Sequence, residues 1–267
     1  MSTKQHILSA QGIAPFLTRK SLAEKINIFD SLESTDKTAK ELAIAGADHG
    51  TVIVADHQVA GKGRRGRAFS SPAGHGLYMS IVLRPEQIQV EVPTLVTMLA
   101  AVATCEAIEV ISNESPQIKW VNDIFIGDKK VCGISAEAVT DLESGDVQWM
   151  VVGIGVNFST PTEDFPEELR QIAGSVFPDG DAPTTRNHLA AEVINRILAP
   201  RETCDTIAML DEYRKRLFIL GNTITVLAPN ETYEAKAIDI DSMGHLIVLR
   251  NTGEQEILST GEISIKP

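Results

Sequence analysis

The sequence predicts an α+β protein whose C-terminal end forms a separate all-β module. Up to about residue 220, short β-branched and apolar runs that fit buried strands alternate with longer helix-like segments. From Gly221 onward the pattern changes to five strand-like runs separated by turn residues. Short strands at this spacing are typical of a small β-barrel, so we expect a boundary near Leu220 between two units that each bury their own core.

The N-terminal half supplies the first helices and strands of the expected α+β unit. Residues 1–25 are mixed in character and predict a short helix or an arm. Ser34-Thr35 predicts the N-cap of a helix that runs to Leu42, because a hydroxyl can accept the free amides of the first turn. Residues 51–55 (TVIVA) and 77–83 (LYMSIVL) predict buried strands, and residues 93–110 predict a long core helix with Pro93 in its first turn.

The remaining elements follow in the same way. Gly127-Asp128 predicts the turn of a hairpin, and Thr184 or Thr185 predicts a helix N-cap. The predicted strands are 118–121, 124–126, 131–139, 147–156, 223–227, 231–240, 246–250, 255–258 and 263–265, and the predicted helices are 185–198 and 206–217.

The composition is that of an ordinary globular protein with an acidic balance. A formal net charge of -12 and a pI near 5.0 argue against a general nucleic-acid binder, whose domain would be basic. Cys105, Cys132 and Cys204 are scattered and odd in number, so we expect small buried side chains in a reducing cytosol. We find no signal-peptide pattern and expect no window apolar enough to span a bilayer, so the sequence predicts a cytoplasmic protein.

One basic segment contrasts with this acidic balance. In Gly61-Lys62-Gly63-Arg64-Arg65-Gly66-Arg67, three glycines are interleaved with four positive charges. Glycine lets backbone amides approach a ligand closely, and arginine offers planar donors that suit phosphate or carboxylate. The segment fits a solvated charge run, a weak nucleic-acid contact or a flap over a small anion. The glycine spacing favours the flap, although the segment matches neither standard phosphate-loop pattern.

Two clusters of lysine and amide residues lie between the next apolar strands. Lys119-Trp120-Val121-Asn122-Asp123 contains a strand break, and Lys129-Lys130 comes shortly before Gly133. Taken alone, these residues fit a turn and an exposed hairpin tip. Their position between strands also allows a lysine to neutralise an anion inside a pocket, with Gly133 permitting close backbone approach.

Two further motifs have both a structural and a functional interpretation. Gly153 and Gly155 near the end of a buried strand either serve packing or form a floor on which a ligand ring lies flat. In Glu33-Ser34-Thr35-Asp36, Ser34 or Thr35 fits a helix cap, and these hydroxyls and the Gln58 amide also fit polar contacts to the head group of a small ligand.

Together these motifs resemble, in order and spacing, the biotin protein ligases. The likeness runs from about Phe29 to Ile265, and the combination is highly specific although no single piece would be. It rests on SLEST at 31–35, QVAGKGRRGRAFSSPAG at 58–74, GLYMSIVLRP at 76–85, KWVNDIFIGDKKVCGIS at 119–135, GIGVN at 153–157 and GEISI at 261–265.

The resemblance implies a fold and a reaction. The fold is a catalytic domain related to class II aminoacyl-tRNA synthetases (biotin/lipoate ligase type) at residues 1–219, with an N-terminal arm at 1–28 and an SH3-like barrel at 220–267. In the reaction, biotin and ATP with Mg²⁺ give biotinyl-5′-AMP and pyrophosphate. A lysine of a biotin carboxyl carrier protein domain then displaces AMP to form an amide. The implied type is monofunctional, without a membrane partner, and a monomer or homodimer.

The resemblance also implies roles for individual residues. Lys130, Arg64 and Asp123 would be catalytic, with Asp123 orienting the acceptor amine. Asn122 would help to position ATP and its metal. Biotin would be bound by Ser34, Thr35, Asp36, Gln58, Gly61, Lys62, Gly63, Arg64, Lys130 and Gly133, and ATP or the adenylate by Arg64, Arg67, Phe69, Lys119, Asn122, Lys130, Asn157 and Ser175, with residues 172–176 bordering the nucleotide.

The chain departs from the usual pattern of these ligases at five places. Lys62 stands where arginine is common, and loses bidentate geometry while it keeps the charge. Asp36 stands where asparagine is frequent, Val121 where proline is usual and Phe69 where tryptophan is common; residues 173–176 match the adenine-side segment only loosely.

Two other functions are compatible with parts of the pattern. A lipoate-type ligase would share the catalytic architecture but not this glycine-arginine segment. A biotin-sensing DNA-binding regulator would need a helix-turn-helix, and only about thirty residues precede Ser34. We therefore expect no specific binding to operator DNA.

Overall fold

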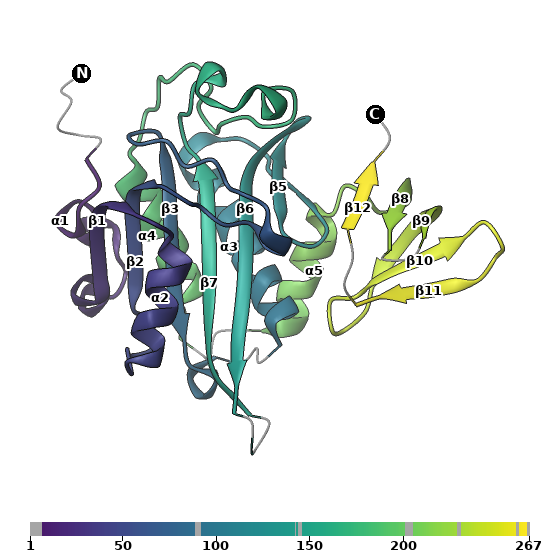
Figure 1. Cartoon of the computed structure of the whole chain (residues 1–267), viewed down its shortest axis with the longest axis horizontal. Coiled ribbons are helices and arrows are strands. Elements are labelled where there is room, and N and C mark those ends of the chain that lie inside the picture. Colours follow the sequence, from purple (N-terminus) through teal and green to yellow (C-terminus); the bar gives the residue numbers. More distant parts are fainter. Residues whose placement is uncertain are drawn as a thin grey trace.

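The computed structural model describes residues 7–88, 92–141, 143, 146–200, 205–228, 231–259 and 262–265. Within these ranges the chain forms a seven-stranded sheet and a five-stranded sheet, and the smaller sheet lies beside the α5 end of the larger one (Figure 1). The change of pattern at Gly221 therefore corresponds to a change from a mixed α+β unit to a β-only unit.

The large sheet is antiparallel except at one edge. Its strand order is β1-β2-β3-β7-β6-β5-β4, and only β1 and β2 run parallel. β1 is absent from the elements predicted from sequence. It is a half-exposed edge strand, so its apolar residues do not alternate cleanly. The strands are β1 (Ile26–Leu32), β2 (Val52–Gln58), β3 (Gly76–Leu83), β4 (Gln117–Lys119), β5 (Asp123–Ile126), β6 (Lys129–Thr140) and β7 (Val147–Asn157).

The strand predicted at 118–121 ends earlier than expected, at Lys119. The next two residues turn away from the sheet because their polar groups have partners elsewhere. The indole Nε1 of Trp120 donates to the carbonyl oxygen of Gly244 over 3.0 Å, and the Tyr213 hydroxyl donates to the carbonyl oxygen of Val121 over 3.0 Å.

Helices cover both faces of the large sheet. α2 (Thr35–Ile44) lies on one face, where Ala39 and Ala43 pack with Ile53, Val82 and Trp149. α3 (Pro93–Ser112), α4 (Arg186–Ile197) and α5 (Thr206–Arg216) lie on the other face (Figure 1). The remaining short helices are α1 (Ala10–Ile13) and 3-10 turns at Ala14–Phe16, Lys20–Lys25, Arg64–Gly66, Pro85–Gln87, Thr162–Asp164 and Glu167–Leu169.

The helix α3 corrects the expectation that no window is apolar enough to span a bilayer. Among the described residues it is long and apolar enough to do so by length and composition. Most of this helix is buried inside the protein, where it contributes Met98, Cys105 and Ile108 to the main core. It is therefore the central helix of the core that the sequence predicted at 93–110.

The small sheet has its five strands where the sequence predicted them. Its order is β11-β10-β9-β8-β12, with all neighbours antiparallel, as an SH3-like module requires. Its strands are β8 (Thr223–Leu227), β9 (Thr232–Ile240), β10 (Leu246–Arg250), β11 (Gln255–Leu258) and β12 (Glu262–Ile265). The division at 219/220 remains a prediction.

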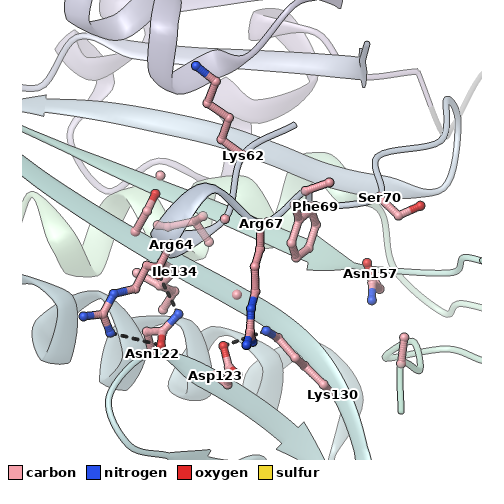
Figure 2. Close-up of a pocket in the computed structure, with 18 of the residues that line it drawn as sticks. Lys62, Arg64, Arg67, Phe69, Ser70, Asn122, Asp123, Lys130, Ile134 and Asn157 are labelled. Atoms are coloured by element: carbon pink, nitrogen blue, oxygen red, sulfur yellow. Dashed lines mark hydrogen bonds and ion pairs between the residues drawn. The ribbon is translucent and has the colours of Figure 1, made fainter. Parts of the chain in front are cut away.

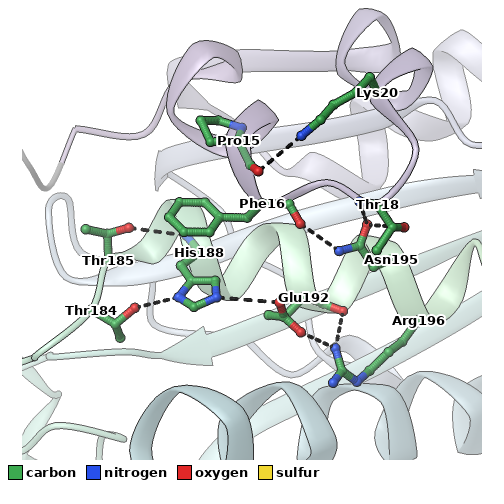
Figure 3. A network of polar contacts seen from close by, with 10 residues as sticks. All are labelled: Pro15, Phe16, Thr18, Lys20, Thr184, Thr185, His188, Glu192, Asn195 and Arg196. Carbon is green, nitrogen blue, oxygen red and sulfur yellow. Dashed lines mark hydrogen bonds and ion pairs between the residues drawn. The ribbon is translucent and has the colours of Figure 1, made fainter.

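The N-terminal arm is fixed along α4. Asn195 accepts from the Thr18 amide and donates to the Phe16 carbonyl, both over 2.9 Å (Figure 3). Asn187 similarly joins Ser9 and Ile7. The Phe16 ring stacks on His188 with a centroid distance of 4.2 Å (Figure 3). The arm is thus part of the folded unit.

The predicted helix cap and the predicted cysteine environment are confirmed in part. Thr185 is the N-cap of α4, and its hydroxyl accepts from the His188 amide over 3.2 Å. Cys105 and Cys132 are buried and unpaired, and burial raises the pKa of both thiols. Cys204 lies outside the described residues.

An ion pair between a buried arginine and a partly exposed aspartate joins α4 to the end of β2. The Arg186 guanidinium, which is 3% exposed, donates to Asp56 over 2.6 Å and to the Gly76 carbonyl over 3.0 Å. We expect Arg186→Met to lower the free energy of unfolding by about 2 kcal/mol, because the charged hydrogen bonds to Asp56 and to the Gly76 carbonyl are lost. Urea denaturation measures this change.

The exposed pair Lys215–Glu212 provides the control for that measurement. Lys215→Met should change the free energy of unfolding by less than about 1 kcal/mol. Equal effects of the two substitutions would show that the Arg186–Asp56 pair contributes no more than a surface pair.

Candidate active site

A cavity of about 330 Å³ lies on the α2 side of the large sheet. Strands β6 and β7 provide its floor, and the flap (residues 59–72) crosses over it (Figure 2). A segment after β7 contributes Phe165, Leu169 and Ile172, and β12 of the small sheet contributes Ile263. The cavity therefore combines residues from regions that are far apart in the sequence.

The floor is built from glycines on one face of two neighbouring strands. On β7, Trp149 and Val151 pack under α2, so the alternation of side chains brings Gly153 and Gly155 to the same face. Gly133 on β6 pairs with Gly155. A Cβ atom on Gly155 would lie 2.5 Å from the Phe69 ring, so glycine is needed for the close approach. The ring that lies over this floor belongs to Phe69, which makes a T-shaped contact with Tyr78 at a centroid distance of 6.3 Å.

The flap is held in a narrow hairpin by backbone hydrogen bonds. The Phe69 amide donates to Gly61 over 2.9 Å, and the Gly63 amide donates to Arg67 over 2.7 Å. Gly66 has a φ of 75°, which favours glycine. Gly61 itself does not line the cavity, but an added Cβ there would overlap the Phe69 carbonyl oxygen and lie 2.7 Å from the Ser71 hydroxyl.

Gly61→Ala is therefore expected to open the flap locally. Amide hydrogen exchange at Phe69 should accelerate by about tenfold or more, because its hydrogen bond to Gly61 is lost. Gly63→Ala is the matched control, since its added Cβ would meet Arg67 at an ordinary 3.5 Å. Similar exchange rates in the two variants would contradict this account.

One amide side chain, that of Gln58, hydrogen-bonds both to the first residue of α2 and to the flap. Gln58 Oε1 accepts from the Thr35 amide over 2.8 Å and from the Thr35 hydroxyl over 3.1 Å, while Nε2 donates to the Ser71 hydroxyl over 2.9 Å. Ser34 is the N-cap residue, but its side chain makes no capping hydrogen bond and does not line the cavity. The capping role predicted for a hydroxyl is thus taken by Gln58.

Asp36 contributes a buried carboxyl to the same end of the cavity. It is 7% exposed and accepts from Ser80 over 2.6 Å and from Ser135 over 2.9 Å. Burial raises the pKa of the Asp36 carboxyl, and the two hydroxyl donors act against that rise.

At the other end of the cavity, positively charged side chains of the flap lie near Lys130 of the β5–β6 hairpin. Arg64 donates to Asn122 Oδ1 over 3.2 Å, and Lys130 pairs with Asp123 at 2.7 Å. Figure 2 shows Arg67 extending from the flap toward this pair, whereas the Lys62 ammonium points away from it. A cavity with this distribution of charge suits an anionic group held between the flap and the hairpin.

The segment after β7 borders this cationic end. The Lys130 amide donates to Ile172, and the Gly174 amide donates back to Lys130. Asn157 lines the cavity, donates to Gly174 over 2.9 Å, and has a buried Oδ1 without a partner. Ser175 is buried, donates to the Thr160 carbonyl over 2.7 Å and does not line the cavity.

The residues present do not form a resident metal site. No group of three histidine, cysteine or acidic side chains that could hold a metal ion occurs in the described part of the chain. Asn122 Oδ1 faces Arg64, and Asp123 faces Lys130. A magnesium ion usually takes one or two protein carboxylates plus substrate phosphates, so these two residues fit at most a contact to a metal that arrives with a nucleotide.

Most of the predicted site residues share this cavity. Ser34, Gly61 and Ser175 are the predicted residues that do not line it. Those that do are Thr35, Asp36, Gln58, Lys62, Gly63, Arg64, Arg67, Phe69, Lys119, Asn122, Asp123, Lys130, Gly133 and Asn157.

Sequence reasoning missed several lining residues. Ser135 carried a signal, since it lies two positions after Gly133 on the same strand face. Phe165 and Leu169 carried none, because ordinary apolar residues in a loop do not indicate a site, and Ile263 lies in the GEISI motif without having been assigned a role there.

Comparison with known proteins identifies related families in two parts of the chain. Residues 28–157 match the Biotin/lipoate A/B protein ligase family, and residues 219–266 match the biotin protein ligase C terminal domain. The bifunctional ligase/repressor BirA of Bacillus subtilis is 35% identical over 259 residues, which cover 94% of this chain and 78% of the relative. The biotin–[acetyl-CoA-carboxylase] ligase of Paracoccus denitrificans is 30% identical over 251 residues, covering 86% of this chain and 96% of the relative.

Solved structures show the same fold. The biotin protein ligase of Aquifex aeolicus in complex with biotin and ATP is 25% identical, with a TM-score of 0.74, and the match covers 90% of this chain and 97% of that one. The Leishmania major enzyme in complex with biotinyl-5-AMP has a TM-score of 0.58 at 22% identity, covering 88% and 98%. The predicted fold, a ligase-type α+β unit followed by an SH3-like module, is confirmed.

Proposed function

This chain belongs to the biotin protein ligase family, and we propose that it activates biotin with ATP and transfers the biotinyl group to a protein lysine. In the first step, a biotin carboxylate oxygen attacks the α-phosphorus of ATP and pyrophosphate leaves. In the second, the neutral lysine amine of a biotin carboxyl carrier protein domain attacks the acyl carbon, AMP leaves, and the nitrogen loses one proton to form an amide.

The observation that carries this proposal is the shared cavity of Arg64 and Lys130. Joining a carboxylate to a phosphate brings two anions together, so cations are needed where negative charge accumulates in the transition state. We assign that role to Lys130 between the biotin carboxylate and the α-phosphate. Arg64 and Arg67 would bind phosphate from the flap side, with Lys119 and Asn122 toward ATP.

The opposite end of the cavity would hold the ring of biotin. Thr35, Gln58 and Asp36 supply polar groups there. Gly63 and Lys62 would act from the flap and Gly133 from the floor. The two residues of the predicted biotin set that do not line the cavity, Ser34 and Gly61, would act only by holding their neighbours in place.

The nucleotide would lie between Phe69 and the segment after β7. Asn157 offers an unpartnered oxygen to an N–H donor, and Phe69 offers an aromatic face to a base. Ser175 would support this segment through Thr160 without direct contact. Closure of the flap would keep water from the mixed anhydride, which otherwise hydrolyses.

The transfer step needs an oriented amine and the acceptor protein. Asp123 is our candidate to orient the amine, since its carboxylate lies at the cationic end of the cavity. Magnesium would enter as the complex with ATP. We also propose that the enzyme works in the cytoplasm as a monomer or homodimer, with a catalytic domain at residues 1–219 and an SH3-like domain at 220–267.

One incubation tests the proposed function. Labelled biotin, MgATP and a biotin carboxyl carrier protein domain should give label on a lysine of the carrier, together with AMP and pyrophosphate. Biotin-dependent exchange of pyrophosphate into ATP would isolate the first step. Exchange that responds to lipoate and not to biotin would instead establish a lipoate-type ligase, and a biotin-dependent shift of a promoter fragment would reveal a regulator.

A further inference from the structure

We propose that Tyr213 of α5, which does not line the cavity, is a positioning residue for the nucleotide end of the site. Its hydroxyl holds the Val121 carbonyl and thereby directs the Asn122 side chain toward the flap. This inference rests on the proposed function and deepens it, because it makes the geometry of Asn122 depend on a residue that touches no substrate.

The residues between β4 and β5 form a short turn (the β4–β5 turn, residues 120–122) inside the polar end of the cavity. Lys119 precedes this turn and Asp123 follows it, and both line the cavity together with Asn122. Trp120 and Val121 are buried. A displacement of the turn would therefore move polar groups that face the proposed nucleotide site.

Each residue of the turn is held by a different part of the fold. The Trp120 indole is bonded to the small sheet. On the β6 side, Asn122 Nδ2 donates to the Ile134 carbonyl over 2.9 Å, and the Ile134 amide donates to the Asn122 carbonyl over 3.0 Å (Figure 2). The Val121 carbonyl accepts from the Tyr213 hydroxyl, which lies on α5. Tyr213 therefore fixes the middle of the turn.

The hydrogen bond from Tyr213 acts on Asn122 through one planar unit. The Val121 carbonyl and the Asn122 nitrogen belong to the same peptide group, which is rigid. If this group rotates, φ of Asn122 changes and its Cβ points elsewhere. Because Asn122 Nδ2 is engaged with Ile134, its Oδ1 is left for Arg64 of the flap at 3.2 Å. Loss of the Tyr213 bond would therefore disturb the contact between the turn and the flap.

Tyr213 is itself a well-fixed donor. The side chain is fully buried, and burial raises the pKa of its hydroxyl, so the group keeps its proton and can donate. The helix around it is fixed on two sides: Arg214 donates to Asp239 of β9 over 2.9 Å, and Arg216 pairs with Glu109 of α3. A supporting residue needs such a fixed frame if it is to hold a site residue in one geometry.

Tyr213→Phe isolates this role. The substitution keeps the ring and its packing, removes the hydroxyl and leaves the buried Val121 carbonyl without that donor. It changes no residue that lines the cavity. An effect on ATP must therefore pass through the β4–β5 turn.

The test is a double-mutant cycle in the full-length protein. Tyr213→Phe, Asn122→Ala and the double variant are compared with the wild type in biotin-dependent pyrophosphate exchange, with KM measured separately for ATP and for biotin. Escape of biotinyl-AMP is measured as label on an added bystander protein. Thermal unfolding sets an assay temperature at which every variant is folded.

The matched control is Tyr233→Phe. It removes a tyrosine hydrogen bond to Glu256 over 2.7 Å in the small sheet, and Tyr233 does not line the cavity. This variant should match the wild type in both KM values and in the escape of biotinyl-AMP.

We expect Tyr213→Phe to raise KM for ATP by about tenfold and to increase the escape of biotinyl-AMP, while KM for biotin stays within about twofold. The double variant should match Asn122→Ala in both quantities, because a residue that acts through Asn122 has no effect once that side chain is absent.

An unchanged KM for ATP in Tyr213→Phe would overturn the proposal. Effects that multiply in the double variant would also overturn it, since Tyr213 would then act independently of Asn122, and so would equal rises of KM for ATP and biotin, which indicate a general structural role. Absence of biotin-dependent exchange in the wild type would instead reject the proposed function, so the two failures are distinguishable.

Discussion

Lys130→Ala is expected to slow biotin-dependent pyrophosphate exchange by about a hundredfold to a thousandfold, because one preorganised charge contact to the transition state is removed. Biotin binding should change little, since the ring contacts lie at the Asp36 end of the cavity. Exchange kinetics give the first quantity and calorimetry gives the second. The split between kcat and affinity is what distinguishes a role in chemistry from one in binding.

Two control variants make the Lys130 result specific. Lys129→Ala changes the adjacent lysine, whose ammonium donates to the Gln171 carbonyl and does not line the cavity. It should stay close to the wild-type rate. Lys130→Arg keeps the charge with altered geometry and should recover part of the rate. Wild-type exchange in Lys130→Ala would refute the proposed role.

Arg64→Gly is expected to let biotinyl-AMP escape about tenfold or more faster than in the wild type. Arg64 links the flap to the β4–β5 turn through Asn122, and a hydrogen bond from a charged donor holds the flap over the intermediate. The escaped mixed anhydride acylates any amine it meets. The escape is measured as the label that appears on an unrelated lysine-rich protein added to the reaction.

The comparison for this variant is Arg64→Lys, which retains a donor at the flap. It should release less intermediate than Arg64→Gly while forming adenylate at a similar rate. If Arg64→Gly retains the intermediate as well as the wild type does, the flap contact is not what confines it.

The sequence predicted the elements around the site more completely than the site's polar geometry. The apolar runs placed β2, β3, β7 and the five strands of the small sheet within a few residues, because buried strands have a strong local signal. β1 escaped prediction since an edge strand is only half buried. The Trp120–Val121 turn was also missed, because its partners Gly244 and Tyr213 are distant in the sequence.

The site residues also divide into those with a local sequence signal and those whose position depends on distant parts of the chain. The cations Arg64 and Lys130 and the floor glycines were predicted from their motifs. Ser175 was predicted to contact the nucleotide, but it does not line the cavity. A hydroxyl in a loosely matching segment does not indicate which way its side chain points. Its bond to the Thr160 carbonyl is a consequence of how the loop folds back.

The amino-acid sequence alone determined which residues bear charge, where glycine permits close approach, and which faces of each strand are apolar, because these are local properties of residue type and spacing. Only the tertiary structure decided that β3 and β6 both flank β7, which brings Ser80 and Ser135 together around Gly153 beneath Asp36. The side-chain period of a strand states which residues share a face. It does not show which strands are neighbours, and that adjacency is why Asp36, an acid in the first turn of α2, forms the end wall of a binding cavity.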